Sequence, residues 1–265
     1  MFPELNSLLG ISTDTVRQGK LTLICDCKTD GGFLVHHFLS YYLKAGCKVC
    51  FVALIQSFSH YNIIAQKLGL NLSTAKDEGQ LVFLEGLKSY TELHFGEKGG
   101  DDNSNPLSFL RTGSEMKPLY EFICSALAPS AGQPWKSSVL ILDDLSVLLS
   151  LGVTSVQVLD FMHYCRATVC GQYKGNVVCL VHGDEECDDE ANELVVKSLY
   201  YQSNLILRAE GLSTGYCKDV HGQLKIFREA NKAGRRGYNQ PDIYQYKIQD
   251  KHVSFFARGL SSAVL

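Results

Sequence analysis

The sequence lacks a strong charge of either sign, a long apolar run and a basic leader. Its 25 basic and 28 acidic residues leave a net charge of −3. That balance excludes a protein that binds nucleic acid or anionic membrane over its whole surface, so an RNA contact would need a local basic patch. No apolar run approaches the roughly 18 residues that cross a bilayer. We therefore expect neither a membrane span nor a secretory signal.

The partner motifs of common metal and nucleophile sites are also missing. The chain has ten cysteines, but Cys47-Lys48-Val49-Cys50 has no second CxxC pair and no His-x-x-x-His partner. Cys50 also begins a strand-like run to Leu54, so the thiols are predicted to be reduced core residues, with no metal and no cofactor. No G-x-S-x-G elbow occurs. The histidines considered as ligands are interpreted as ordinary hydrogen-bonded or exposed ones: His36, His37, His60, His163 and His182.

Short apolar runs alternate with amphipathic helical segments, which predicts an α/β fold with a mostly parallel sheet flanked by helices. Parallel strands are expected at 21–25, 49–54, 81–84, 139–142 and 176–181. Alternating residues after a turn at His221-Gly222 predict added antiparallel strands. One domain, 1–265, is expected to contain an N-terminal segment (1–19), a surface insertion (97–117), an acidic loop (183–193) and a basic loop (228–241).

The turn after the first strand, residues 26–33, lies where P-loop proteins carry GxxxxGK[ST]. In that motif backbone N–H groups surround the phosphates, the Lys neutralises them and the Ser or Thr holds magnesium. Aligned by position, Asp26 replaces the first Gly and Gly31 keeps the second. Gly32 replaces the Lys and Phe33 replaces the hydroxyl. The loop is therefore interpreted as a degenerate phosphate loop.

The charges inside this loop are also wrong for a nucleotide. Asp26 and Asp30 would repel a triphosphate at close range. Lys28 and Thr29 are adjacent and could replace the missing pair, but they lie three residues too early in the motif.

Asp143 and Asp144 end the 139–142 strand, as carboxylates do in the strand that helps to hold magnesium in P-loop ATPases. A strand that ends in Asp because the chain turns is an equal alternative. After the second strand, Gln56 can orient a water but cannot take its proton at neutral pH. We therefore predict a Walker B-like strand, no catalytic residue and no independent ATP hydrolysis.

One basic cluster follows near the C-terminus, among glycines and just before Tyr238. Basic residues in a flexible loop beside an aromatic suit RNA phosphates and base stacking. A solvated loop between two strands is the alternative. The candidate tRNA-binding residues are Lys225, Arg228, Lys232, Arg235 and Arg236.

Over nearly its full length the chain resembles the Elongator complex protein 6 family. The segments that carry the resemblance are 18–23, 30–38, 52–61, 142–149 and 244–251. The insertion, the acidic loop and the segment after Phe227 match poorly. The resemblance implies a RecA-like fold without its own active site. It also implies a hetero-hexameric ring with the fourth and fifth Elongator proteins, which binds tRNA and docks on the catalytic Elongator subcomplex that modifies the wobble uridine. Such a protein is expected in the cytoplasm, with the nucleus also open.

Two other functions stay open at this point. One is a ring ATPase subunit whose missing groups come from neighbouring subunits, and nucleotide titration of the chain and of the ring would separate it. The other is a RecA-like DNA-recombination accessory protein, for which a preference for single-stranded DNA over tRNA would be evidence. The lack of a helical DNA-binding domain before Lys20 counts against the second.

Overall fold

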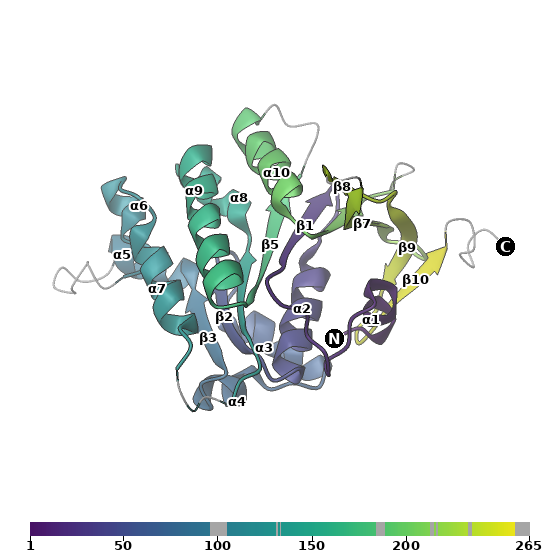
Figure 1. Ribbon diagram of the computed structural model, residues 1–265, viewed down its shortest axis with the longest axis horizontal. Helices are drawn as coiled ribbons and strands as arrows, with labels where there is room; N and C mark the ends of the chain where they lie inside the picture. Colours follow the sequence, from purple (N-terminus) through teal and green to yellow (C-terminus); the bar gives the residue numbers. More distant parts are fainter. Residues whose placement is uncertain are drawn as a thin grey trace.

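One sheet runs through the molecule, and helices cover both faces of its parallel part (Figure 1). The computed structural model describes residues 1–95, 105–130, 132, 134–183, 189–212, 215, 217–232 and 235–257. In this part of the chain the strand order is β10-β9-β7-β6-β1-β5-β4-β2-β3, and β8 pairs with β7. The strands are β1 (Leu21–Cys27), β2 (Lys48–Ala53), β3 (Leu81–Glu85), β4 (Ser138–Asp143), β5 (Asn176–His182), β6 (Leu205–Glu210), β7 (Gly222–Lys232), β8 (Arg235–Tyr238), β9 (Asp242–Ile248) and β10 (Val253–Ala257).

The strands β1 to β6 are parallel, and β7, β9 and β10 extend the sheet in antiparallel pairing. This confirms the predicted parallel core with antiparallel additions. β6 and β7 form an antiparallel pair, and they are joined by the longer segment 211–221 rather than by a turn at His221-Gly222 alone. No helix among the described residues is long and apolar enough to cross a membrane.

The helices divide the apolar core into two layers, one on each face of the sheet. One layer packs under α1 to α4, and the other under α7 to α10 (Figure 1). The helices are α1 (Pro3–Leu9), α2 (Gly32–Lys44), α3 (Phe58–Lys67), α4 (Leu72–Asp77), α5 (Gly86–Phe95), α6 (Phe109–Thr112), α7 (Lys117–Leu127), α8 (Leu145–Ser150), α9 (Ser155–Cys165) with the π-helical turn η2 (Arg166–Gln172), and α10 (Glu190–Gln202).

The central strands are mostly apolar because both of their faces are covered. In β1, Leu23 packs into one layer and Ile24 into the other. Polar residues appear where these strands end, at Asp26 in β1, Asp143 in β4 and His182 in β5. The sheet therefore presents its titratable groups at one edge, where parallel strands place their carboxyl ends.

The segment 97–117, expected as a surface insertion, contributes to the core. Leu107, Phe109 and Met116 are at most 4% exposed and pack into the layer under α7. Its Gly, Asp, Asn and Ser residues suggested a surface loop. The apolar side chains near its end are nevertheless buried, as large apolar side chains usually are. Residues 96–104 lie outside the described part of the chain.

The acidic segment 183–193 is likewise only in part a loop. Asp189 caps α10 by accepting a hydrogen bond from the backbone N–H of Asn192, and Glu190 and Glu193 lie in the first helical turn. Carboxylates at that end are stabilised by the helix dipole, so this acidic run marks a helix start as well as a solvated surface. Residues 184–188 lie outside the described part.

The basic segment 228–241 is a β-hairpin rather than a flexible loop. β7 runs to Lys232 and pairs with β8 in antiparallel register, with Glu229 opposite Tyr238. The Tyr238 ring lies 5.0 Å from that of Tyr200, and its hydroxyl donates to the carbonyl of Ser203 at 2.8 Å. Tyr238 is thus packed on α10 through Tyr200 and Ser203.

Candidate functional site at the carboxyl edge of the sheet

Three parallel strands bring their terminal polar residues together. β5 lies between β1 and β4 in the sheet, and its register sets His182 opposite Asp26. The end of β4 continues into Asp143 and Asp144. The loop that resembles a degenerate phosphate loop and the Walker B-like carboxylates therefore meet at this edge, with a histidine between them.

His182 joins the two strand ends on either side of it. Its Nδ1 atom lies 2.5 Å from Asp26 Oδ1, and its Nε2 atom lies 2.7 Å from Asp144 Oδ2. Both carboxylates are buried, while the imidazole is half-exposed. Contact first with Asp144 and then with Asp26 raises the pKa of His182 from 6.5 to about 10. At neutral pH the ring is therefore a cation that compensates two buried carboxylates.

Two backbone amides of this loop donate to carboxylates of the loop itself. The N–H of Gly31 donates to Asp26 Oδ2 at 2.8 Å, and that of Gly32 donates to Asp30 Oδ1 at 2.7 Å. A Cβ at position 31 would lie 3.0 Å from the Asp26 Cβ, so glycine permits this close approach. At the start of α2, where a nucleotide phosphate would accept these hydrogen bonds, carboxylates accept them instead.

The position of the missing hydroxyl has become a packing position. Phe33 is 7% exposed, and its ring lies 4.9 Å from that of Tyr246 on β9. The hydroxyl of Thr29 lies 3.0 Å from that of Tyr246, so it contacts the antiparallel extension of the sheet. Lys28 is exposed and has a backbone φ of 54°. Phe33 and Thr29 thus tie the loop to β9.

The two strand-end aspartates have different contacts. Asp144 accepts a hydrogen bond from the Ser146 N–H at 2.9 Å and caps α8, as the turn interpretation expects. Asp143 is 5% exposed and accepts a hydrogen bond from the Tyr61 hydroxyl. Burial, and then the neighbouring Asp144, raise the pKa of Asp143 from 3.8 to about 7. Asp143 is thus a poor magnesium ligand at neutral pH unless binding expels its proton.

Sequence reasoning missed His182 and Tyr61. His182 was set aside as an ordinary histidine, yet it follows a buried strand directly, as Asp26 and Asp143 do. Strand-end position was the available signal, because carboxyl ends of neighbouring parallel strands converge. Nothing in the spacing of Tyr61, which reaches Asp143 from α3, could have shown its contact.

The two basic candidates whose side chains the structure describes, Lys225 and Arg228, do not share one surface. Lys225 Nζ pairs with Glu210 Oε2 at 2.7 Å. Arg228 pairs with Asp242 and donates to the carbonyl of Leu8, on the side of α1. Being three residues apart on one strand, Lys225 and Arg228 point to opposite faces of the sheet. The side chains of the other three, Lys232, Arg235 and Arg236, lie outside the described part.

The cysteine pair considered for a metal or redox role is part of the core. Cys47 and Cys50 are both fully buried at the start of β2, and burial raises the pKa of Cys50 to about 12. No group of three or more His, Cys, Asp or Glu side chains in the described part is arranged to hold a metal ion.

Comparison with known proteins decides the family. The family model described as Elongation complex protein 6 matches residues 2–250. Elongator complex protein 6 of Xenopus laevis is 77% identical over 265 residues, covering all of both chains. The chain belongs to the Elongator complex protein 6 family. The human family member is 59% identical over 271 residues, again across both full lengths. The Dictyostelium discoideum member is 23% identical and covers 94% of each chain.

A solved structure shares the overall α/β fold. It is an uncharacterized protein from Pyrococcus horikoshii, crystallised in complex with an unknown peptide. It matches with a TM-score of 0.57 over 97% of this chain and 98% of its own. At 12% identity, this likeness concerns the fold alone. Membership of the Elongator complex protein 6 family rests on the sequence matches, and makes the chain an Elongator subunit.

Proposed function

We propose that this Elongator subunit is non-catalytic and assembles with the fourth and fifth Elongator proteins into a RecA-like hetero-hexameric ring. The ring binds tRNA and presents it to the catalytic Elongator subcomplex, which adds carboxymethyl-type groups to the wobble uridine. The protein works in the cytoplasm and also in the nucleus. Family membership supports the partnership with other Elongator proteins.

The observation that carries the non-catalytic role is the self-occupied phosphate loop. Asp26 and Asp30 take the amides of Gly31 and Gly32, and His182 holds Asp26 in place. A phosphate brought to those amides would meet the carboxylates at close range. Two like charges 4 Å apart repel by about 4 kcal/mol near a protein surface. The fold is then retained for its subunit interfaces rather than for hydrolysis.

The assembly is tested by the mass of the complex that this chain forms with its Elongator partners, with and without tRNA. Two copies of each of three subunits are expected, and the mass should rise by bound tRNA. A chain that stays monomeric beside its partners, or a ring that takes up no tRNA, would contradict the proposal.

The RNA contact is assigned to the β7–β8 hairpin, through Arg235 and Arg236. Replacing both by Gln should weaken tRNA binding by the ring and lower the slope of log affinity against log salt by about two. The matched control is Lys88→Gln with Lys117→Gln, two exposed lysines on α5 and α7. If affinity and salt slope stay unchanged in the arginine variant, the hairpin does not contact the tRNA phosphates.

An ATPase completed by neighbouring subunits is the second candidate. It is favoured by the two carboxylates, Asp143 and Asp144, that stand at the end of β4 beside the loop. Nucleotide titration of the isolated chain and then of the ring separates the candidates. Binding that appears only in the ring and is lost in Asp143→Asn would favour the shared site.

A further inference from the structure

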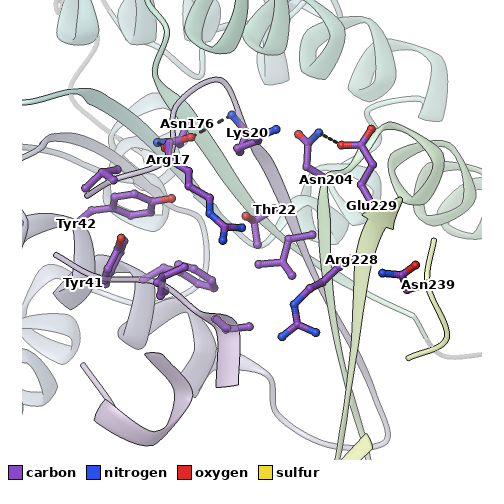
Figure 2. Close-up of a pocket in the computed structure, with 15 residues that line it drawn as sticks. Arg17, Lys20, Thr22, Tyr41, Tyr42, Asn176, Asn204, Arg228, Glu229 and Asn239 are labelled. Atoms are coloured by element: carbon purple, nitrogen blue, oxygen red, sulfur yellow. Dashed lines mark hydrogen bonds between the residues drawn. The ribbon is translucent and has the colours of Figure 1, made fainter. Parts of the chain in front are cut away.

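A hollow lies at the opposite edge of the sheet from the Asp26 and His182 site, beside the amino end of β1. It has a volume of about 270 Å³ and is bordered by residues from the segment before β1, from α2 and from β7 (Figure 2). None of the residues that line it belongs to the Asp26 and His182 site. The hollow is therefore a separate candidate for binding.

Three cationic side chains line this hollow: Arg17, Lys20 and Arg228. In Figure 2 the guanidinium groups of Arg17 and Arg228 are directed into the same space. Arg228 is already paired with Asp242 and with the carbonyl of Leu8. These partners hold the Arg228 guanidinium in place, and its charge is already paired.

Arg17 and Lys20 differ from Arg228, because no carboxylate among the described residues forms an ion pair with them. Arg17 makes one long contact, 3.4 Å from its Nη2 atom to the carbonyl of Gly10. The one lining carboxylate, Glu229, accepts a hydrogen bond from the Asn204 amide. Arg17 and Lys20 can therefore bind an anion at this hollow.

The remaining walls are suited to an apolar body. Leu9, Val16 and Phe38 line the hollow, beside Tyr42. The Tyr41 hydroxyl is held by its donation to the carbonyl of Ser12 at 2.8 Å, which fixes that ring. Small-ligand sites typically combine such apolar walls with a few placed polar groups.

We propose that this hollow binds a small phosphate monoester that carries an apolar or aromatic body. A phosphate monoester bears close to two negative charges at neutral pH, so it can pair with both Arg17 and Lys20. Arginine binds phosphate oxygens through two parallel N–H donors, while lysine adds a point charge. The volume lies just below the roughly 300–1,000 Å³ typical of ligand pockets, so it suits a compact ligand rather than a dinucleotide. This site does not rest on the proposed ring function.

The test is calorimetric titration of the full chain with three probes: phenyl phosphate, inorganic phosphate and phenol. Phenyl phosphate should bind at one site, inorganic phosphate more weakly and phenol not measurably. Arg17→Gln with Lys20→Gln should weaken phenyl phosphate binding about a hundredfold or more, since each change removes a charge-assisted hydrogen bond. Both side chains are exposed, so the fold should survive, and thermal unfolding checks this. Arg111→Gln, on the distant helix α6, is the matched control.

Arg17→Lys adds a second check, because it keeps the charge and loses the two-pronged geometry. It should bind phenyl phosphate with an affinity between those of the native chain and the double variant. Absence of phenyl phosphate binding overturns the proposal. So does binding that is unchanged in the double variant, or weakened equally by Arg111→Gln. None of these results bears on ring assembly, so failure here is distinguishable from failure of the proposed function.

Discussion

Replacing His182 by Gln should destabilise the protein, and by an amount that depends on pH. The change removes the cation between the buried carboxylates of Asp26 and Asp144. Removing one partner of a fully buried ion pair costs about 3–5 kcal/mol, and an exposed pair contributes about 0–1 kcal/mol. Because the imidazole is 49% exposed and so partly screened, we expect about 2 kcal/mol. For a chain of this size that lowers the Tm by about 4–8 °C.

The sign of the pH dependence follows from the direction of the shift. The pKa of His182 is raised from 6.5 to about 10, so its stabilisation is complete below 6.5 and is lost as pH rises through 10. The Tm difference between native chain and His182→Gln should therefore be greatest near about pH 6 and shrink towards about pH 9. Differential scanning calorimetry across this range measures it. His163→Gln, an exposed histidine on α9, is the control. The bridging role would be refuted if His182→Gln had the same Tm as the native chain, or if it lowered the Tm by the same amount at every pH.

Three further changes probe other parts of the account. Phe109→Ala should cost about 3–5 kcal/mol of unfolding free energy in denaturant titration, while Phe95→Ala, at an 81% exposed position, should cost almost nothing. Equal losses of unfolding free energy in the two variants would contradict the burial of Phe109. Tyr246→Phe should cost about 1 kcal/mol, since it removes the hydroxyl contact with Thr29, and an unchanged midpoint would count against that contact. Asp143→Asn should raise the Tm above pH 7, where the native carboxylate is charged and buried, and the gain should fade as pH drops towards 3.8. A gain that grows at low pH would contradict the assigned shift.

The parallel core could be predicted because its strands are apolar on both faces and are separated by helical periodicity. A strand was predicted at Val139 to Leu142, and all four residues are at most 1% exposed in β4. The prediction failed where a segment was assigned to the surface from its composition alone. Residues such as Phe109 were assigned to a surface insertion because the neighbouring residues are polar, although burial is decided residue by residue.

At the candidate site the substitutions were visible in the sequence, but their contacts were not. Gly32 and Phe33 stand where a P-loop has its lysine and hydroxyl, and this could be seen from the motif alone. That the Asp26 carboxylate turns inward to the Gly31 amide depends on the turn geometry. That His182 bridges two strand ends depends on the order of strands in the sheet, which no local pattern contains.

The central claim is that the phosphate loop is filled by the chain's own carboxylates and does not turn over nucleotide. The direct measurement is magnesium-dependent phosphate release from ATP by the purified full chain, beside Asp143→Asn. We expect the native chain to release no more phosphate than buffer, and the variant to match it. Release by the native chain that disappears in Asp143→Asn would contradict the claim.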